Sequence, residues 1–209
     1  MISVIIPAYN EEKTIGNVLN VLTKINIIDE IIVVNDGSED NTVAEAKKYN
    51  IILINLRKNM GKGAAVKAGI EKSKGDIIVM LDADLVGLTE THFLSLINPV
   101  LNDSADMSIG VFSSGRKSTD LAQKIAPFLS GQRAMNKKYF IDFLNLKDLD
   151  TCKYGLEIAL TKYAKIKKLR LVQIPFENMT HIMKEEKLGI LKGFYARLKM
   201  YLDILKIWV

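Results

Sequence analysis

Two carboxylates one residue apart, Asp82 and Asp84, follow the apolar run 77–81. Five apolar residues in a row are too few for a buried helix and too uniform for a half-exposed strand, so they predict a central strand buried on both faces. Open α/β sheets bind ligands at the carboxyl ends of their strands, where these carboxylates could hold a divalent cation against a phosphorylated substrate. A solvated acidic turn after the strand is the simpler alternative.

The pattern around this pair alternates between strands and helices. Runs rich in β-branched residues predict strands at Ile2–Ile6, Glu30–Val34, Ile51–Asn55 and Asp76–Leu81, and helical spacing lies between them at 11–24, 40–49, 62–73 and 90–98. Repeated βα units imply a parallel sheet with right-handed crossovers. The expected fold is therefore α/β: a Rossmann-like, mostly parallel sheet flanked by helices.

Each of these strands ends in polar residues. The loops are Pro7-Ala8-Tyr9-Asn10-Glu11, Asn35-Asp36-Gly37-Ser38 and Arg57-Lys58-Asn59-Met60-Gly61-Lys62-Gly63, in addition to the aspartate pair. Any one of them could be an ordinary turn, but four on one sheet edge indicate a ligand site. Gly61 allows close approach of the backbone, and Lys62 places an ammonium at a helix start, which suits a phosphate. The spacing of a P-loop is absent, and no Gly-x-Gly-x-x-Gly follows the first strand, which argues against NAD or FAD. The loops therefore imply a nucleotide but not a dinucleotide.

Composition limits the class of protein. The chain has 209 residues, 48% of them hydrophobic, which suits a single domain with a sizeable core. One cysteine, Cys152, is compatible with a reducing cytoplasm, and neither a secretory signal nor a membrane-spanning run is predicted. The net charge of +5 comes from scattered lysines, so anionic substrates or a membrane surface are favoured over nucleic acid.

The first hundred residues resemble the nucleotide-sugar half of a GT-A fold, family-2-like glycosyltransferase. The resemblance rests on Val-Ile-Ile-Pro-Ala-Tyr-Asn-Glu-Glu, Ile-Val-Val-Asn-Asp-Gly-Ser-Glu-Asp-Asn-Thr, Asn-Met-Gly-Lys-Gly and Asp-Ala-Asp, in family order. It implies that Ala8, Tyr9 and Glu11 border the base and ribose, that Asp36 contacts the base, and that Lys62 approaches the nucleotide. Asp82 and Asp84 would meet ribose, diphosphate and metal. The implied donor site also includes Pro7, Gly61 and Ala83.

In the second half, residues 105–112 predict another strand, followed by a polar loop that contains Gly115, Arg116, Ser118 and Thr119. Arginine and hydroxyl groups suit an anionic acceptor, although an ordinary exposed loop is equally compatible. Further on, the helix from about residue 156 to 167 carries Glu157 in its first turn, where the helix dipole alone would favour a carboxylate.

These second-half features resemble glucosyl-3-phosphoglycerate synthase and its small relatives. The resemblance implies an acceptor loop at Gly115-Arg116-x-Ser118, a sugar-binding segment at 130–134, a sugar-contacting Glu157 and a third metal ligand at His181. Two departures count against 3-phosphoglycerate as the acceptor. Lys153 stands where those synthases have Gly, and Ser130-Gly-Gln-Arg stands where they have a Gly-Gly-Glu-type segment.

The expected cofactor is Mn²⁺ or Mg²⁺, held by Asp84 and His181. Carboxylate, imidazole and diphosphate ligands suit Mn²⁺ at least as well as Mg²⁺. The other histidine, His92, lies on a predicted helix and is expected to be structural.

A single domain is expected over residues 1–209, with a donor half (1–100), an acceptor half (101–183) and an amphipathic C-terminal helix (184–209). Packing on the domain or a homodimer contact explains that helix most simply. A basic amphipathic helix could also lie on the inner membrane surface and bring a lipid-linked acceptor within reach.

The sequence therefore predicts a cytoplasmic, non-processive hexosyltransferase that uses a UDP- or GDP-hexose, with UDP-glucose favoured. The acceptor is expected to be small and anionic, and a polyprenyl phosphate is the alternative. Inverting relatives need a carboxylate base on the acceptor hydroxyl, and the chain offers no convincing Glu-Asp pair for that role, so the resemblance to retaining synthases favours retention of anomeric configuration. Two further alternatives are a nucleotidyltransferase, whose Gly-rich signature is absent after the first strand, and a non-catalytic nucleotide-binding module.

Overall fold

A computed structural model describes residues 1–113, 130–145 and 155–181. Several predicted features lie outside these ranges: the acceptor loop with Gly115, Arg116, Ser118 and Thr119, Lys153 with the neighbouring Cys152, and the C-terminal helix 184–209.

One mixed sheet forms the centre of the described residues. Its strands, in spatial order, are β3 (Ile52–Asn55), β2 (Glu30–Asn35), β1 (Ile2–Ala8), β4 (Ile77–Met80), β7 (Arg133–Asn136), β6 (Met107–Ser113) and β8 (Leu171–Glu177). The first four are mutually parallel, whereas β7 runs antiparallel to both β4 and β6. A separate two-stranded ribbon pairs β5 (Leu85–Val86) with β9 (Thr180–His181).

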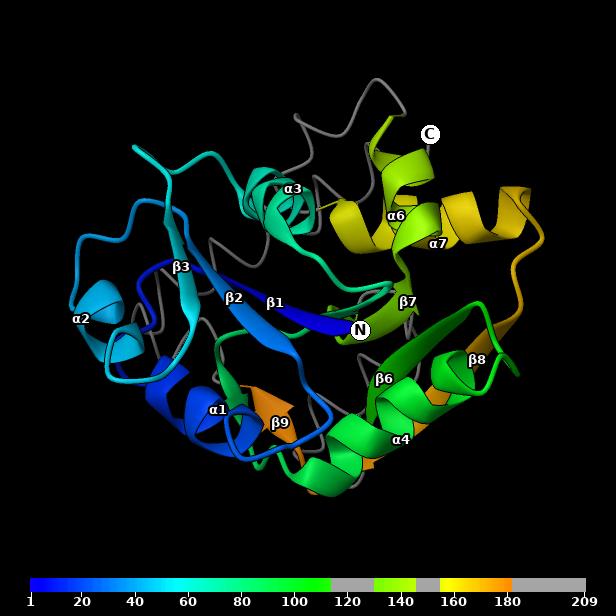
Figure 1. Ribbon diagram of the computed structural model, residues 1–209, viewed down its shortest axis with the longest axis horizontal. Coiled ribbons are helices and arrows are strands. Elements are labelled where there is room, and N and C mark those ends of the chain that lie inside the picture. Colours follow the sequence, from blue (N-terminus) through cyan, green and yellow to red (C-terminus); the bar gives the residue numbers. More distant parts are fainter. Residues whose placement is uncertain (114–129, 146–154, 182–209) are drawn as a thin grey trace, which may run out of the picture.

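Helices cover both faces of this sheet (Figure 1). One face carries α1 (Ile15–Leu22), α2 (Thr42–Ala46) and α4 (Glu90–Leu101), and the other carries α3 (Lys62–Lys72), α6 (Lys137–Leu144) and α7 (Leu156–Ile166). Side chains alternate along a strand, so the sheet feeds two cores: Val4 and Ile6 pack with α1 and α4, and Ile5 packs with α3. This sandwich fixes the carboxyl ends of β1, β2 and β4 relative to one another.

The α/β, mostly parallel fold predicted from the sequence is confirmed. The helix expected at 40–49 is the short α2, and the strand expected at 105–112 is β6, shifted to Met107–Ser113. The short strand β7 was not predicted, because a four-residue run that begins with Arg133 lacks a strand pattern. It nevertheless lies inside the sheet, between β4 and β6, where its Ala134 and Met135 are fully buried.

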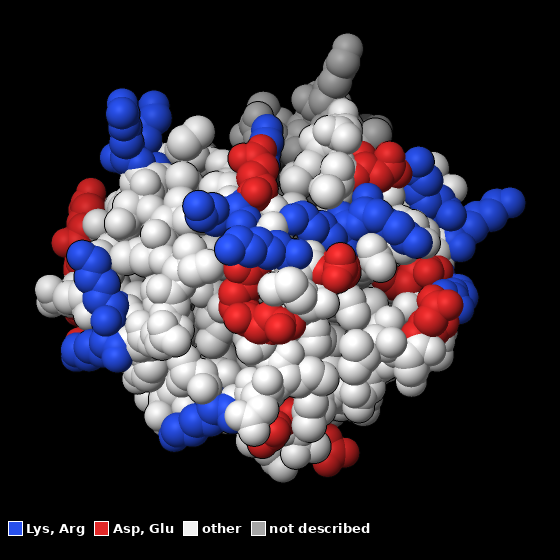
Figure 2. Space-filling model, in the orientation of Figure 1, with Lys and Arg blue, Asp and Glu red and all other residues white. Residues whose placement is uncertain are grey.

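Charge on the surface is mixed. Figure 2 shows lysine and arginine side chains interspersed with acidic ones on the visible face, in agreement with the scattered lysines of the sequence. Among the residues that the structure describes, no helix has the length and apolar character needed to span a bilayer.

Candidate functional site

The carboxylate of Asp36 connects the end of β2 to the loop that precedes α3. Asp36 follows β2 and is buried, and its two side-chain oxygens accept hydrogen bonds from the backbone N–H groups of Met60 (2.7 Å) and Gly61 (2.8 Å). Gly37 has φ +73, and a Cβ there would lie 2.7 Å from the backbone nitrogen of Asn59. The loop before α3 therefore packs backbone to backbone on the end of β2.

The loop after β1 is fixed to the same region. Asn10 has φ 56, its N–H donates to Ser38 Oγ (3.0 Å), and the N–H of Glu11 donates to Thr42 Oγ1 (2.7 Å). Tyr9 is 42% exposed just beyond Ala8, the buried last residue of β1. The structure therefore groups the predicted donor residues Pro7, Ala8, Tyr9, Glu11 and Asp36 along the ends of β1 and β2.

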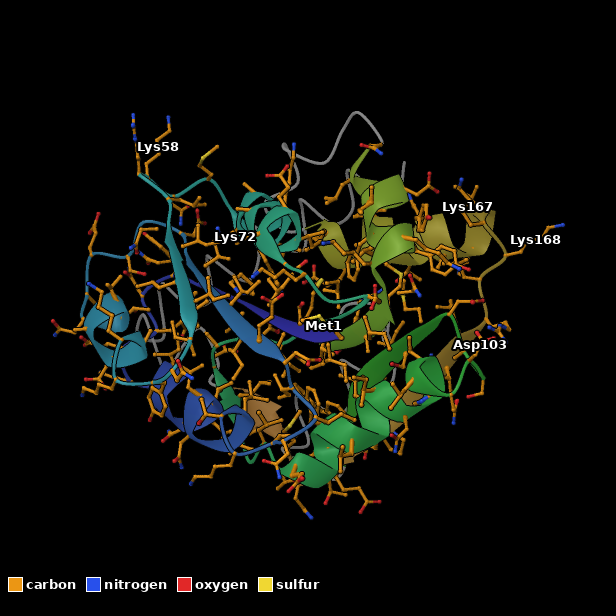
Figure 3. All side chains as sticks on the ribbon, viewed as in Figure 1. Met1, Lys58, Lys72, Asp103, Lys167 and Lys168 are labelled. Carbon is orange, nitrogen blue, oxygen red and sulfur yellow. The ribbon has the colours of Figure 1, made fainter. Side chains whose placement is uncertain are left out.

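Lys62 bridges the two halves of the chain. It is the first residue of α3, and its Nζ lies 2.6 Å from Asp82 Oδ1 and 2.6 Å from Glu157 Oε1. Burial alone would lower the pKa of this ammonium, but the two carboxylates outweigh burial and raise it above its usual value. Lys62 is therefore a permanent cation at neutral pH. Lys58, in the same loop, points outward into solvent (Figure 3).

Asp82 is also held by Gln132. The side-chain Oε1 of Gln132 accepts from the backbone N–H of Asp82 (3.0 Å), and its Nε2 donates to Asp82 Oδ2 (2.8 Å). The residue before it, Gly131, lies against the ion pair, and a Cβ there would sit 2.6 Å from Lys62 Nζ. Only a residue without a side chain fits that position without displacing the lysine.

A buried arginine supports Glu157 from below. Arg133 is fully buried, and its guanidinium donates to the carbonyl oxygen of Glu157 (2.9 Å) and to Thr161 Oγ1 (3.0 Å). Burial lowers the pKa of Arg133 to about 10, partly offset by the nearby Glu157. Arg133 therefore attaches α7 to β7, and Lys62 links α7 to α3 and to Asp82 after β4. Glu157, in the first turn of α7, is buried.

The predicted metal ligands are brought together at the level of the backbone. Asp84 lies between β4 and β5, and the β5–β9 ribbon pairs Leu85 with His181, which puts the two predicted ligands in adjacent register. A carboxylate and an imidazole are a donor set that fits Mn²⁺. Within the described ranges no group of three or more His, Cys, Asp or Glu side chains gathers into a metal cluster.

Two further residues complete the picture. Ala83 is buried between the aspartates, which fixes the spacing of the pair. His92 on α4 contacts the Glu177 carbonyl oxygen (3.0 Å) and packs on the ring of Phe176, so its expected structural role is confirmed. The individual contributions of Gln132 and Arg133 were not predicted. Local sequence patterns could not show them, because the contacts span 50 residues from Gln132 to Asp82 and 24 from Arg133 to Glu157. The segment 130–134 was identified only through the family resemblance.

Polar loops at the carboxyl ends of parallel strands, an acidic pair after β4 and an antiparallel β7 agree with the GT-A fold expected from the sequence. Residues 3–160 match the family model described as "Glycosyl transferase family 2". The chain belongs to that family and is a glycosyltransferase.

Relatives of known activity extend this assignment. The chain is 32% identical, over 86% of its own length and 86% of the relative's, to UDP-N-acetylglucosamine–dolichyl-phosphate N-acetylglucosaminyltransferase of Methanococcus voltae. It is 41% identical over 97 residues to dolichyl-phosphate beta-glucosyltransferase ALG5D of Trichomonas vaginalis, covering 40% of this chain and only 30% of that relative. The human dolichyl-phosphate beta-glucosyltransferase is 39% identical over 118 residues, covering 49% of this chain and 36% of the relative.

The fold is shared with solved structures. Glucosyl-3-phosphoglycerate synthase of Mycobacterium tuberculosis, in complex with Mn²⁺, UDP-glucose and phosphoglyceric acid, superposes with a TM-score of 0.74 at 23% identity, covering 98% of this chain and 77% of that one. The same synthase was also solved with Mg²⁺ and UDP. The predicted GT-A fold is thereby confirmed, and divalent metal with UDP is used by proteins of this fold.

Proposed function

We propose that the protein transfers a hexose or N-acetylhexosamine from a UDP-sugar to a polyprenyl phosphate. The observation that carries the donor half of this proposal is the bridge of Lys62 to Asp82 and Glu157. It provides one permanent cation, at the start of a helix, for the diphosphate and one buried carboxylate for sugar hydroxyls. The uracil base would lie against Tyr9 and Asp36, at the ends of β1 and β2.

A divalent ion fits beside this site. Asp84 and His181 would hold it, and when bound it would stabilise the negative charge that develops on the departing diphosphate. Mn²⁺ and Mg²⁺ in structures of the same fold support this choice. The protein's own contribution is to hold Asp84 at the end of β4 and to keep Lys62 charged beside the leaving group.

Relatives favour the lipid acceptor over the small anionic acceptor that the sequence patterns favoured. The Methanococcus voltae relative, matched over 86% of both chains, is an enzyme whose name specifies dolichyl phosphate, and the two shorter matches described above share that acceptor. The likeness to the phosphoglycerate enzyme, at 23% identity, concerns the fold alone. 3-Phosphoglycerate remains the second candidate acceptor because of that bound ligand.

A phosphate acceptor also changes the argument about stereochemistry. The resemblance to retaining synthases, together with the absence of a carboxylate pair that could act as base, favoured retention, but a phosphate oxygen is already ionised at neutral pH and needs no base. Asp82 and Glu157, both paired with Lys62, are poorly suited to proton abstraction in any case. The word "beta" in the names of two relatives supports inversion from an α-linked donor. The anomeric proton signals of fresh product distinguish the two outcomes.

A transfer assay tests the proposal. Radiolabelled UDP-glucose and UDP-N-acetylglucosamine would be incubated with the protein, Mn²⁺ and detergent-dispersed polyprenyl phosphate, or with 3-phosphoglycerate instead. We expect the label in the organic phase, lost with EDTA and in Lys62→Met, and retained in Lys72→Met, an exposed lysine at the opposite end of α3. Transfer to 3-phosphoglycerate alone would contradict the lipid assignment, and release of free sugar without any transfer would contradict both acceptors.

A further inference from the structure

Gln132 binds a single neighbour with both ends of its side chain. The side-chain carbonyl accepts from the backbone N–H of Asp82, and the NH₂ group donates to the carboxylate of the same residue. Gln132 is only 2% exposed, so its amide is shielded from water and depends on these partners. Two hydrogen bonds to one aspartate fix both the end of β4 and the orientation of the carboxylate.

The segment that carries Gln132 is itself rigidly held. The Gln132 carbonyl oxygen accepts from the N–H of Gly110 in β6 (2.8 Å), and Ser130 Oγ donates to the Gly110 carbonyl. Arg133 Nε donates to the carbonyl oxygen of Ser130 (3.0 Å). The side chain of Gln132 therefore starts from a backbone anchored on β6 and cannot follow Asp82 if that residue moves.

The orientation of Asp82 matters because its two oxygens face different partners. Oδ2 accepts from Gln132, while Oδ1 lies 2.6 Å from Lys62 Nζ. Lys62 is shared with Glu157, so a rotation of the Asp82 carboxylate would move the ammonium as well. Gln132 thus controls the position of the cation without touching it.

We propose that Gln132 is a positioning residue for donor binding, acting through Asp82 and Lys62. This rests on the proposed function, since it takes the diphosphate of a UDP-sugar as the ligand of that pair. Gln132 contributes no group to the reaction. It preorganises the charge that receives the donor, so its loss weakens binding of the nucleotide more than it slows transfer from the bound complex.

The first test compares Gln132→Met with Gln173→Met. Methionine keeps the length of glutamine and removes both hydrogen bonds, and Gln173 is an exposed residue on β8 that serves as the matched control. The dissociation constant of UDP, measured by calorimetry with Mn²⁺, should rise about tenfold in Gln132→Met, as expected for loss of hydrogen bonds to a charged group. It should be unchanged in the control. If Gln132→Met lowers only the melting temperature and binds UDP within about twofold of the control, the role is purely structural and the proposal is wrong.

The second test moves the charge instead of removing it. In Asp82→Asn, the new NH₂ group would face the NH₂ of Gln132, and adding Gln132→Glu restores an acceptor there. The double variant should bind UDP at least about threefold more tightly than Asp82→Asn alone, because donor and acceptor are merely exchanged between the two positions. No recovery would overturn the proposal.

The same proteins separate this proposal from the proposed function. A wild-type chain that binds no UDP would contradict the proposed donor and with it the role of Gln132 in donor binding. In that case, the melting temperatures of the ligand-free single and double variants still show whether residues 82 and 132 are coupled in stability, because this coupling does not depend on nucleotide. Normal UDP binding in the wild type with an uncoupled pair would refute the role of Gln132 alone.

Discussion

The donor half and the second half of the chain contribute to the same edge of the sheet in different ways. In the donor half, the candidate site residues directly follow parallel strands. Neighbouring loops hydrogen-bond to one another, as Asp36 does with Met60 and Gly61. In the second half, the residues come from β7, from the segment just before it and from α7, and their side chains contact residues far away in the sequence, as Gln132 does with Asp82.

The difference lies in which atoms are held. Donor-half contacts are mostly from side chain to backbone and shape the loops that would surround a nucleotide. The second half contributes charged side chains: Glu157 forms an ion pair with Lys62, and Arg133 donates a hydrogen bond to the carbonyl oxygen of Glu157. In the proposed function, the first half would therefore shape the nucleotide site, and the second half would set the charge that the nucleotide meets.

The largest expected effect is on the proposed metal site, where Asp84 from the first half and His181 from the second would meet. Asp84→Asn should reduce sugar transfer by about 10²–10³-fold and remove its dependence on Mn²⁺, because the ligand to the ion that stabilises the leaving group is lost. Asp76→Asn, an exposed position before β4, is the matched control and should leave transfer unchanged. Transfer by Asp84→Asn at the wild-type rate would separate the acidic pair from catalysis.

Gly37→Ala tests the backbone packing of the donor half. Its Cβ would meet the backbone of Lys58 and Asn59 at 2.7 Å and would also have to adopt φ +73, so we expect a loss of about 2–3 kcal/mol in the free energy of unfolding. Gly16→Ala on α1, whose Cβ would stand 3.4 Å from the Tyr49 hydroxyl, should be neutral or slightly stabilising. Urea denaturation of both variants measures the contrast, and equal effects would mean that the loop yields easily.

Lys62→Met tests the charge supplied across the two halves. It leaves Asp82 and Glu157 as neighbouring carboxylates, and we expect a loss of about 1–2 kcal/mol of stability, reduced from the value for a fully buried pair because the lysine is 28% exposed.

The pH dependence of that loss follows from the raised pKa of Lys62. A cation whose pKa is higher in the folded state than in the unfolded state stabilises the fold. This contribution to the free energy of unfolding is fully present below the unfolded-state pKa and is lost only as the pH rises through the folded-state pKa. The difference between wild type and Lys62→Met should therefore be constant between about pH 7 and 9. A difference that shrinks across this range would show that the ammonium is not held as described.

The smallest expected effect concerns Gly131 in the second half. A Cβ there meets side-chain tips instead of backbone, the Lys62 ammonium at 2.6 Å and the Asp82 carboxylate oxygens at 2.7 and 2.8 Å, so the ion pair must shift while the backbone need not. Gly131→Ala should retain most of its stability. Its affinity for UDP should fall about three- to tenfold, because the displaced Lys62–Asp82 ion pair would meet the diphosphate less well. A large loss of stability would indicate that segment 130–133 is less tolerant than the donor-half loops.

The sequence predicted the donor half well because its signals are local. An apolar strand, its polar end and the next helix start are neighbours in the chain, so Asp36, Lys62 and Asp82 could be placed on one edge from spacing alone. The structure groups them there and adds the partners of each.

The second half could not be predicted to the same depth. The insertion of β7 between β4 and β6 depends on long-range pairing, and the amide of Gln132 gains meaning only when Asp82 lies beside it. Glu157 was identified through resemblance, and its carboxylate does lie against Lys62. The fully buried Arg133 runs against the usual preference of arginine for the surface, so composition gave no sign of it.

A crystal structure with UDP and Mn²⁺ is the most direct test of the proposed donor site. We expect the diphosphate between Lys62 and the end of β4, the ion held by Asp84 and His181, and the base near Tyr9 and Asp36. A diphosphate and ion bound at any other edge of the sheet would contradict it.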